Sequence, residues 1–406
     1  MAAWVSAGLA PLREAVSGAV APSDFPGDFV PAARRARGER AGTDLETGNR
    51  EAAAMGAPTF APYGAPYHAH PPPALMVVRP LVPLGFRGAA LAWLGLSLLA
   101  AAVLAWIVTG LFVADRQARF RWALLGFVVV SLWPPLLHNF EKGQWSVLIA
   151  ALLALAWTAS ARGWDGRAGA LIAAAGCFKV LPFMLLGAFL ARPGRWRVLA
   201  GALVATVVLV GLSAIVVGLD SWSGFAAWSG VNATGWQTAP ANTLSLWGAL
   251  ARLAIGGPYA RAAFSSPSLA RLIWGALALA LLGLAARQTI RTSRTSDRSA
   301  QAPPAEAFAA WSVLAVVLGP LSWTHTSTWL ILPVALLLRS RLGARARLGL
   351  AAAVVLLTVP RLSLLALAGP WPVSPVGGLA LGLHLVGALA VFAVACARPA
   401  AQGTTP

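Results

Sequence analysis

Long apolar runs recur along this 406-residue chain and constrain its fold more than any other feature. They fall at about 89–114, 123–137, 144–161, 168–191, 197–219, 267–286, 305–320, 326–339, 348–369 and 378–397. A helix of roughly 20 apolar residues crosses the hydrocarbon core of a bilayer. Inside that core, only helices and closed barrels satisfy all their backbone polar groups. We therefore predict an all-α, polytopic integral membrane protein with about ten membrane segments.

The composition supports lipid rather than water as the surrounding solvent. Hydrophobic residues make up 58% of the chain and charged residues 11%, whereas soluble domains carry about 25% charged residues. The formal net charge of +18 would suggest nucleic acid in a soluble protein. Here the basic residues lie in short loops between apolar runs, so we expect topology signals and no nucleic-acid partner.

The arginines in the short loops predict the orientation, because cytoplasmic loops carry an excess of Lys and Arg. The basic clusters fall at 116–121, 162–167, 192–197, 287–298 and 339–347, with Arg398 after the last segment. Segment 168–191 has basic flanks at both ends but is too short for two full spans. We predict a broken hairpin that turns near Lys179 and Pro182, because proline breaks a helix. The external face then collects 23–75, 138–144, the tip near Lys179, 220–266 and 322–326.

Three regions follow from this threading. Residues 1–75 form an N-terminal extramembrane region that contains the first external loop, 76–397 form the transmembrane domain with external loop 220–266, and 398–406 form a cytoplasmic tail. The first 22 residues do not read as a cleavable signal peptide, since Arg13 and Glu14 interrupt a weakly apolar stretch. No clear helix precedes the first external loop. Either the N-terminus is translocated as it stands or, as we favour, an upstream first helix is missing from this sequence.

Three aspartates are candidates for a general base on the external face. Asp24 and Asp28 lie in Ser-Asp-Phe-Pro-Gly-Asp-Phe, and Asp44 lies in Thr-Asp-Leu-Glu. A carboxylate at the membrane surface can accept the proton of a sugar hydroxyl. The alternative for each is an aspartate that caps a loop or turn.

Three further residues are candidates for binding an anion. Lys179 lies within a broken membrane segment, where ionisable residues are costly and usually functional, and a lysine suits phosphate as a point charge. Gln144, with the N–H groups of a helix start at 138–144, could face an anionic ligand. His325 could hydrogen-bond a phosphate or a sugar. The alternatives are a snorkelling Lys179, an ordinary helical first turn at Gln144, and an aromatic belt around His325.

His68 and His70 precede Pro71-Pro72-Pro73. Two histidines at this spacing could ligate a metal, but no carboxylate or cysteine spacing completes such a site, so we expect no metal. We favour a loop stiffened by proline that leads into an interfacial helix, with one of these histidines lining a site.

An ordered set of motifs resembles the bacterial polyprenol-phosphate-mannose-dependent mannosyltransferases, glycosyltransferase family 87. The motifs are Tyr67-His68-Ala69-His70-Pro71-Pro72, Gly143-Gln144-Trp145-Ser146-Val147-Leu148, Ala168-Gly169, Phe178-Lys179-Val180-Leu181-Pro182, Arg195-Trp196-Arg197, Asn242-Thr243-Leu244-Ser245-Leu246 and Ser322-Trp323-Thr324-His325. The resemblance implies an enzyme of the GT-C type with its active face outside. Two departures are the absence of a clear first helix and Thr326, which stands where the family often has a second histidine.

The resemblance also implies a reaction and roles for individual residues. A sugar, mannose by the family, would pass with inversion from a polyprenyl-phosphate donor to a glycan or glycolipid acceptor. The family's aspartate base maps onto Asp24, because Ala32-Ala33 follows at the family's offset, with Asp28 and Asp44 as alternates. The implied donor-phosphate residues are Lys179, His325 and Gln144, and the implied acceptor or sugar residues are His70, Asn242 and Trp323. No nucleotide sugar is involved, so no cofactor and no metal motif are expected, and the location is the bacterial cell membrane.

Two rival hypotheses remain. A multi-pass transporter or lipid flippase would show interrupted helices in matching positions of two similar halves, whereas the sequence predicts one broken segment. An inactive structural membrane subunit is the third possibility.

Overall fold

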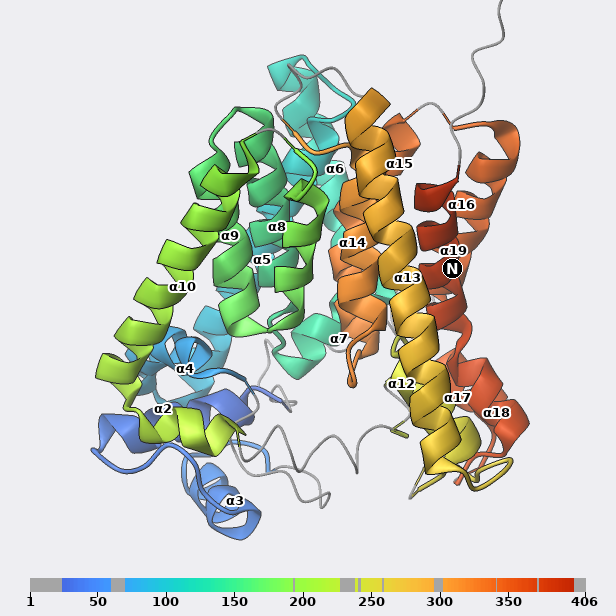
Figure 1. The fold of residues 1–406 in the computed structure, drawn as a ribbon. Helices are drawn as coiled ribbons and strands as arrows, with labels where there is room; N and C mark the ends of the chain where they lie inside the picture. The colour runs from blue at the N-terminus through green and yellow to red at the C-terminus, as the bar shows by residue number, and fades with distance from the viewer. Residues whose placement is uncertain are drawn as a thin grey trace, which may run out of the picture.

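A computed structural model describes residues 24–59, 70–192, 194–226, 238–239, 242–257, 259–295, 302–340, 342–370 and 372–397. Within these ranges the regular secondary structure is helical, apart from isolated bridges that join Ala260 to Gly257 and to Val373. Figure 1 shows a bundle of long helices with shorter helices at one end. The predicted all-α class is confirmed for the described residues. The extreme N-terminus and the predicted tail at 398–406 lie outside them.

The N-terminal elements build one end of the molecule and the first long helix. They are α2 (Pro26–Ala36), α3 (Leu45–Ala54), α4 (Pro72–Val78), η1 (Arg79–Leu84) and α5 (Gly85–Thr109). Pro26 fits the first turn of α2, where a missing N–H costs nothing. The last three elements are continuous over 38 residues, and this stretch is apolar enough to span a membrane. The helix therefore starts earlier than the predicted segment at 89–114.

The middle of the chain runs through the left and centre of Figure 1, with α8, α9 and α10 at the left. Its elements are α6 (Arg116–Ser131), α7 (Pro134–Lys142), α8 (Ser146–Ala161), α9 (Asp165–Phe178), η2 (Leu181–Phe189) and α10 (Arg195–Val217). Close packing of α9 on α10 depends on glycine, because a Cβ at Gly169 would lie 1.9 Å from the carbonyl oxygen of Val198. Small residues of this kind let membrane helices approach closely.

The C-terminal half forms the remaining helices of the bundle. They are α12 (Leu246–Ala254), α13 (Pro267–Thr295), α14 (Ala305–Val317), η3 (Thr324–Leu330), α15 (Ile331–Arg339), α16 (Ala344–Thr358), α17 (Arg361–Ala368), α18 (Pro375–Leu381) and α19 (Leu383–Cys396). Helix α12 lies inside the stretch predicted as the long loop 220–266. Helix α13 continues to Thr295, so much of the basic stretch predicted as loop 287–304 is helical.

The predicted count of about ten membrane segments is not confirmed. Among the described residues, three helices are long and apolar enough to cross a membrane, or up to five if each bent pair counts as one span. Two of the predicted segments are bent. Helices α6 and α7 meet at 70° just before Pro134, because proline stops a helix, and α18 and α19 meet at 50° at Gly382. The prediction of a single broken segment is therefore wrong.

The predicted hairpin at 168–191 does break at the expected place. Helix α9 ends at Phe178, Lys179 has an extended backbone (φ −151°, ψ 118°), and Pro182 lies in the first turn of η2. In Figure 1 the chain reverses direction here, and η2 runs back beside α9 and α14. Lys179 thus lies at the tip of the turn.

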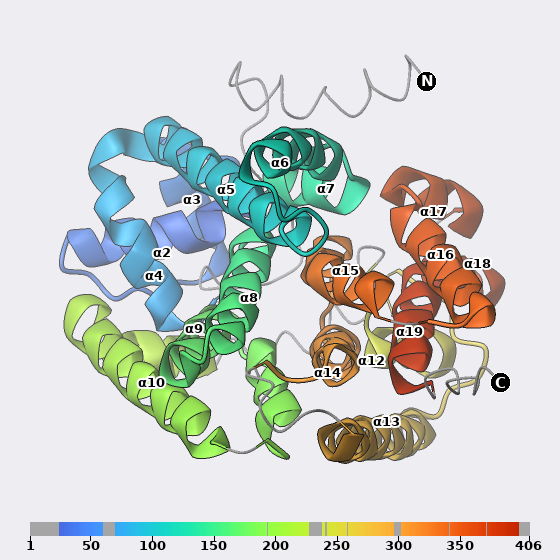
Figure 2. The ribbon, with the colours of Figure 1, turned by 90° about the horizontal axis from the view of Figure 1, so that it is seen from above.

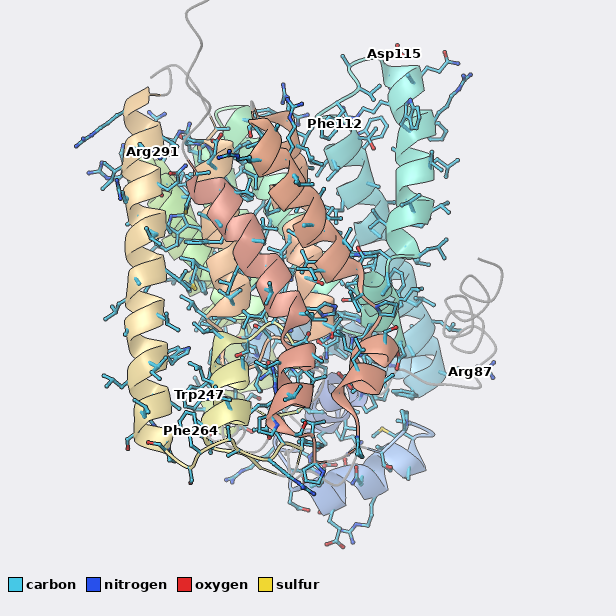
Figure 3. All side chains as sticks on the ribbon, turned by 90° about the vertical axis from the view of Figure 1, so that its right-hand side faces the viewer. Arg87, Phe112, Asp115, Trp247, Phe264 and Arg291 are labelled. Carbon is cyan, nitrogen blue, oxygen red and sulfur yellow. The ribbon has the colours of Figure 1, made fainter. Side chains whose placement is uncertain are left out.

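The exposed surface of the bundle is largely apolar, as lipid requires. Leu203 and Val207 on α10 are 65% and 61% exposed, and Leu279 on α13 is 72% exposed. Figure 3 shows Phe112, Asp115 and Arg291 toward one end, and Arg87, Trp247 and Phe264 toward the other. Most arginine-rich helix ends gather at the first of these ends, and α2, α3 and α12 gather at the second (Figure 1).

Candidate active site

Asp24 lies in the turn that leads into α2, where it is only partly buried. Its backbone N–H donates to the carbonyl oxygen of Lys142 at 3.1 Å. Its carboxylate oxygen Oδ2 accepts a hydrogen bond of 2.7 Å from the side-chain amide of Gln144. The segment between α7 and α8 therefore holds Asp24 in place, while its side chain remains partly exposed.

Asp28 lies one helical turn further along and is 1% exposed. Trp145 donates its Nε1–H to Asp28 at 2.9 Å, and the Nδ1 atom of His70 lies 2.9 and 3.0 Å from the two carboxylate oxygens. Because a carboxylate is an acceptor, it favours the proton on Nδ1 and leaves Nε2 of a neutral ring as an acceptor. Asp28 is thus buried, and both of its carboxylate oxygens lie within hydrogen-bond distance of His70. The sequence analysis assigned His70 to sugar binding.

An aromatic cluster supports both aspartates. Phe25 stacks on Trp93 with ring centroids 5.4 Å apart, Trp93 meets Trp145 edge to face at 4.5 Å, and Trp145 lies 4.8 Å from Phe178. Trp93 also donates its Nε1–H to the carbonyl oxygen of Gly143 at 2.9 Å. These contacts join α2, α5, the start of α8 and the end of α9, so they fix Lys179, which follows Phe178.

Lys179 brings a positive charge to this cluster. Asp24 and Asp28 are the carboxylates whose charges act on it. Lys179 is half-buried at the hairpin tip, with the exposed Val180 beside it. A cation held beside two carboxylates, at an edge of apolar surface, is suited to a lipid-linked phosphate.

His325 lies in η3 and is 1% exposed. Its ring centroid lies 5.5 Å from that of His138, and neither of its ring nitrogens has a hydrogen-bond partner. The charges of Lys179, His138, His70 and Lys142 act on it electrostatically, Lys179 most strongly. Buried polar atoms normally find partners, so this imidazole is a candidate to bind a ligand beside Lys179.

The prediction that 138–144 starts an apolar helix is wrong. Residues up to Lys142 belong to α7, which ends at Gly143 in the left-handed conformation (φ 66°) that glycine adopts without strain. Helix α8 begins at Ser146, and the side-chain oxygen of Asn139 accepts the N–H of Val147 at 3.2 Å. The side-chain amide N–H of Gln144 donates to the carboxylate of Asp24, so it does not point at a ligand phosphate. Its side-chain oxygen has no partner.

The motifs around Asn242 and Trp323 hold each other in place. The side-chain amide of Asn242 donates to the carbonyl oxygen of Pro320 at 3.2 Å and accepts from the backbone N–H of Ser322 at 2.7 Å. Ser245 donates its hydroxyl to the carbonyl oxygen of Gly319 at 2.6 Å. Trp323 follows at the start of η3, which carries His325. Asn242 thus orients the segment that presents His325, and a sugar-binding role for Asn242 or Trp323 stays a prediction.

Asp44 acts as the N-cap of α3. It is exposed, and its Oδ1 accepts the backbone N–H of Thr47 at 2.8 Å. This N–H, together with the Thr47 side chain, holds the pKa of the Asp44 carboxyl below its usual range. These contacts match the capping alternative for this residue.

Sequence reasoning assigned no role to His138, Trp145 or Phe178. Trp145 and Phe178 stand directly beside the candidates Gln144 and Lys179 and lie within two of the family-like motifs, and these were the available signals. His68 lies outside the described residues. Among those that are described, no group of three or more His, Cys, Asp or Glu side chains could hold a metal ion.

The geometry defines a polar site near one end of an apolar helical bundle, and comparison with known proteins gives its class. The sequence profile of glycosyltransferase family 87 matches residues 67–302, more than half of the chain. The chain therefore belongs to glycosyltransferase family 87, which confirms the resemblance. Asp24, Asp28 and His325 lie outside the matched range.

A similar protein comes from Mycolicibacterium smegmatis. It is a polyprenol-phosphate-mannose-dependent alpha-(1-2)-phosphatidylinositol mannoside mannosyltransferase, and the two are 29% identical over 281 residues. The aligned region covers 62% of this chain and 59% of that protein, so the chain matches less than two thirds of its relative's length. No solved structure matches.

Proposed function

We propose that this protein transfers a mannosyl group from a polyprenyl-phosphate donor to a glycan or glycolipid acceptor on the external face of the bacterial cell membrane. Family membership supports the glycosyltransferase class, and the relative's name supports the donor. The observation that carries the proposal is the electrostatic interaction of Lys179 with both Asp24 and His325, three residues from distant parts of the chain. They lie on the side of the bundle away from most arginine-rich ends, which the positive-inside rule assigns to the cytoplasm.

In the proposed reaction the acceptor hydroxyl attacks the anomeric carbon as the bond to the phosphate oxygen breaks. The hydroxyl proton passes to Asp24, and the anomeric centre inverts. Asp24 suits the base better than Asp28, because Asp28 is buried and its oxygens already face His70 and Trp145. A general base of this kind contributes about two to four decades in rate.

The leaving group is a polyprenyl phosphate, which gains negative charge as the bond breaks. Lys179 and His325 are placed to stabilise that charge, and groups aimed at developing charge are the strongest contributors in such sites. Gln144 holds Asp24 instead of the phosphate. The polyprenyl chain stays in lipid beside the exposed Val180.

The test is sugar transfer from radiolabelled polyprenyl-phosphate mannose in membranes that contain the protein. We expect Asp24→Asn to lower the transfer rate by about two to four decades while donor binding survives. The matched control is Asp28→Asn, which should lose much less transfer per folded molecule. Normal transfer by Asp24→Asn would refute the assignment of the base.

The same assay separates the enzyme from the rival flippase. A glycosyltransferase releases polyprenyl phosphate in proportion to the sugar transferred, whereas a flippase moves the donor intact. Replacing the mannose donor by its glucose counterpart then tests the sugar. Transport of intact donor without release of polyprenyl phosphate would overturn the proposed function.

A further inference from the structure

A second feature with binding capacity lies away from the candidate active site. A cavity of about 800 Å³ opens between α5, α6, α8 and α15 at the arginine-rich end of the bundle. Figure 2, which views the molecule from above, shows these four helices as neighbours. The volume falls within the roughly 300–1,000 Å³ typical of ligand sites.

The lining has two chemically distinct parts. Apart from Thr158 and three arginines, its side chains are apolar or glycine. Phe120 and Leu124 on α6 are 64% and 58% exposed, so in a membrane this wall of the cavity contacts lipid. An apolar chain can therefore enter from the bilayer without crossing a polar barrier.

The three arginines come from three different helices. Arg119 lies in the first turn of α6, Arg162 caps the end of α8, and Arg339 ends α15. The charges of Arg119 and Arg162 lie close enough to act on each other. No ion pair among the described residues includes any of the three. The cavity thus carries concentrated positive charge with no carboxylate partner in the described part of the chain.

Arg119 is also held in a fixed position. Its Nε and Nη2 atoms donate to the carbonyl oxygen of Trp106 at 3.2 and 2.9 Å, and its guanidinium lies 4.1 Å from the centroid of the Trp106 ring. Gly110 makes room for it, because a Cβ there would lie 2.3 Å from the guanidinium. This arginine is therefore ordered without an acidic partner.

We propose that this cavity binds an anionic phospholipid, with the phosphate at Arg119, Arg162 and Arg339 and an acyl chain along the apolar wall. Charge complementarity selects this occupant, since basic pockets between membrane helices on the cytoplasmic side bind anionic head groups. The site is independent of the proposed transfer reaction, whose residues lie on the other side of the bundle. It adds a lipid-binding site that the active site does not explain.

The test uses native mass spectrometry of the purified full chain with equal amounts of dioleoyl phosphatidylglycerol and dioleoyl phosphatidylcholine. We expect the wild type to retain phosphatidylglycerol preferentially. The double variant Arg162→Gln/Arg339→Gln removes two exposed arginines. Arg162 also lies over the ring of Trp164 at 5.4 Å, a contact outside the cavity lining. At about fivefold per arginine, it should lower the preference roughly 25-fold.

The matched control is Arg116→Gln/Arg121→Gln. It also removes two positive charges, from the start of α6 at the arginine-rich end of the bundle, but neither arginine lines the cavity. It should keep the preference, and an equal loss in this control would overturn the proposal, as would an unchanged preference in the first variant. Leu124→Trp fills the apolar part without altering charge and should lower binding of the phosphatidylglycerol. Displacement of phosphatidylglycerol by an equal amount of polyprenyl phosphate would show that the cavity holds the donor's chain and would also overturn the proposal.

Discussion

Replacement of Asp28 by asparagine should affect stability more than chemistry. The indole N–H of Trp145 can only donate a hydrogen bond, so the single oxygen of the asparagine side chain must accept it. The amide NH₂ then faces Nδ1 of His70, and that nitrogen must lose its proton to accept. A hydrogen bond to a charged group contributes about 1.5–3 kcal/mol, and one such bond is lost. We expect the free energy of unfolding to fall by about 1.5–3 kcal/mol.

Asparagine at Asp24 should behave in the opposite way. The oxygen of Asn can still accept the amide N–H of Gln144, and the site is only partly buried. The free energy of unfolding should then fall by no more than about 1 kcal/mol, while transfer falls by about two to four decades. The two variants therefore distinguish the roles of Asp24 and Asp28 by two independent measurements, the free energy of unfolding and the transfer rate.

The assay combines unfolding in mixed detergent micelles with transfer measured per folded molecule. A double-mutant cycle of Asp28→Asn with His70→Ala should give a coupling energy of about 0.5–3 kcal/mol, because each variant removes the same contact. Wild-type stability in Asp28→Asn together with a transfer loss equal to that of Asp24→Asn would refute this reasoning. The base would then be Asp28.

Three further predictions test other parts of the structure. Lys179→Ala should weaken donor binding strongly at normal expression, and wild-type affinity and turnover would leave this lysine as a topology anchor only. A reporter fused within 287–304 should read cytoplasmic, and a periplasmic reading would reverse the orientation. Gly169→Ala should lower the free energy of unfolding by about 1–3 kcal/mol, because its Cβ meets the backbone of Val198. Gly211→Ala on α10 is the control, since its Cβ meets nothing within 4 Å, and equal losses would contradict close packing at Gly169.

The sequence allowed prediction of the helical class and of the turn at Lys179, because apolar content and proline are local signals. It did not allow prediction of how many helices cross the membrane. Proline at the first position of a helix does not interrupt an apolar run, so α6 and α7 read as one segment across Pro134. Pro360, the N-cap residue of α17, likewise leaves the predicted segment at 348–369 uninterrupted between α16 and α17. Hydropathy reports how apolar a segment is and not where its axis bends.

The candidate site was predictable residue by residue but not as an arrangement. Lys179 and His325 were chosen for local reasons, and Asp24 was preferred over Asp28 and Asp44 by the family resemblance. In the structure, Lys179 interacts electrostatically with both Asp24 and His325. The contact between Asp28 and His70 joins residues 42 positions apart, so no periodicity in the sequence could indicate it. Asn242 was assigned to sugar binding by resemblance, whereas its amide bonds to the backbone of 320–322. A motif indicates that a residue is important, but it does not indicate which group that residue contacts.

The charges of the site suggest why one lysine can serve two stages of the proposed reaction. Before transfer, the negative charges that act on Lys179 are those of Asp24 and Asp28. As the acceptor attacks, Asp24 takes up a proton and becomes neutral, while the departing phosphate gains one negative charge. The net charge around Lys179 is therefore conserved, and negative charge moves from one of its neighbours to the other. Such a site needs little reorganisation in the transition state, which is the condition under which fixed charges accelerate a reaction most. The contacts of Asp28 with His70 and Trp145 hold its carboxylate in place, so in the proposed reaction Asp28 fixes the geometry without taking part in the transfer of the proton.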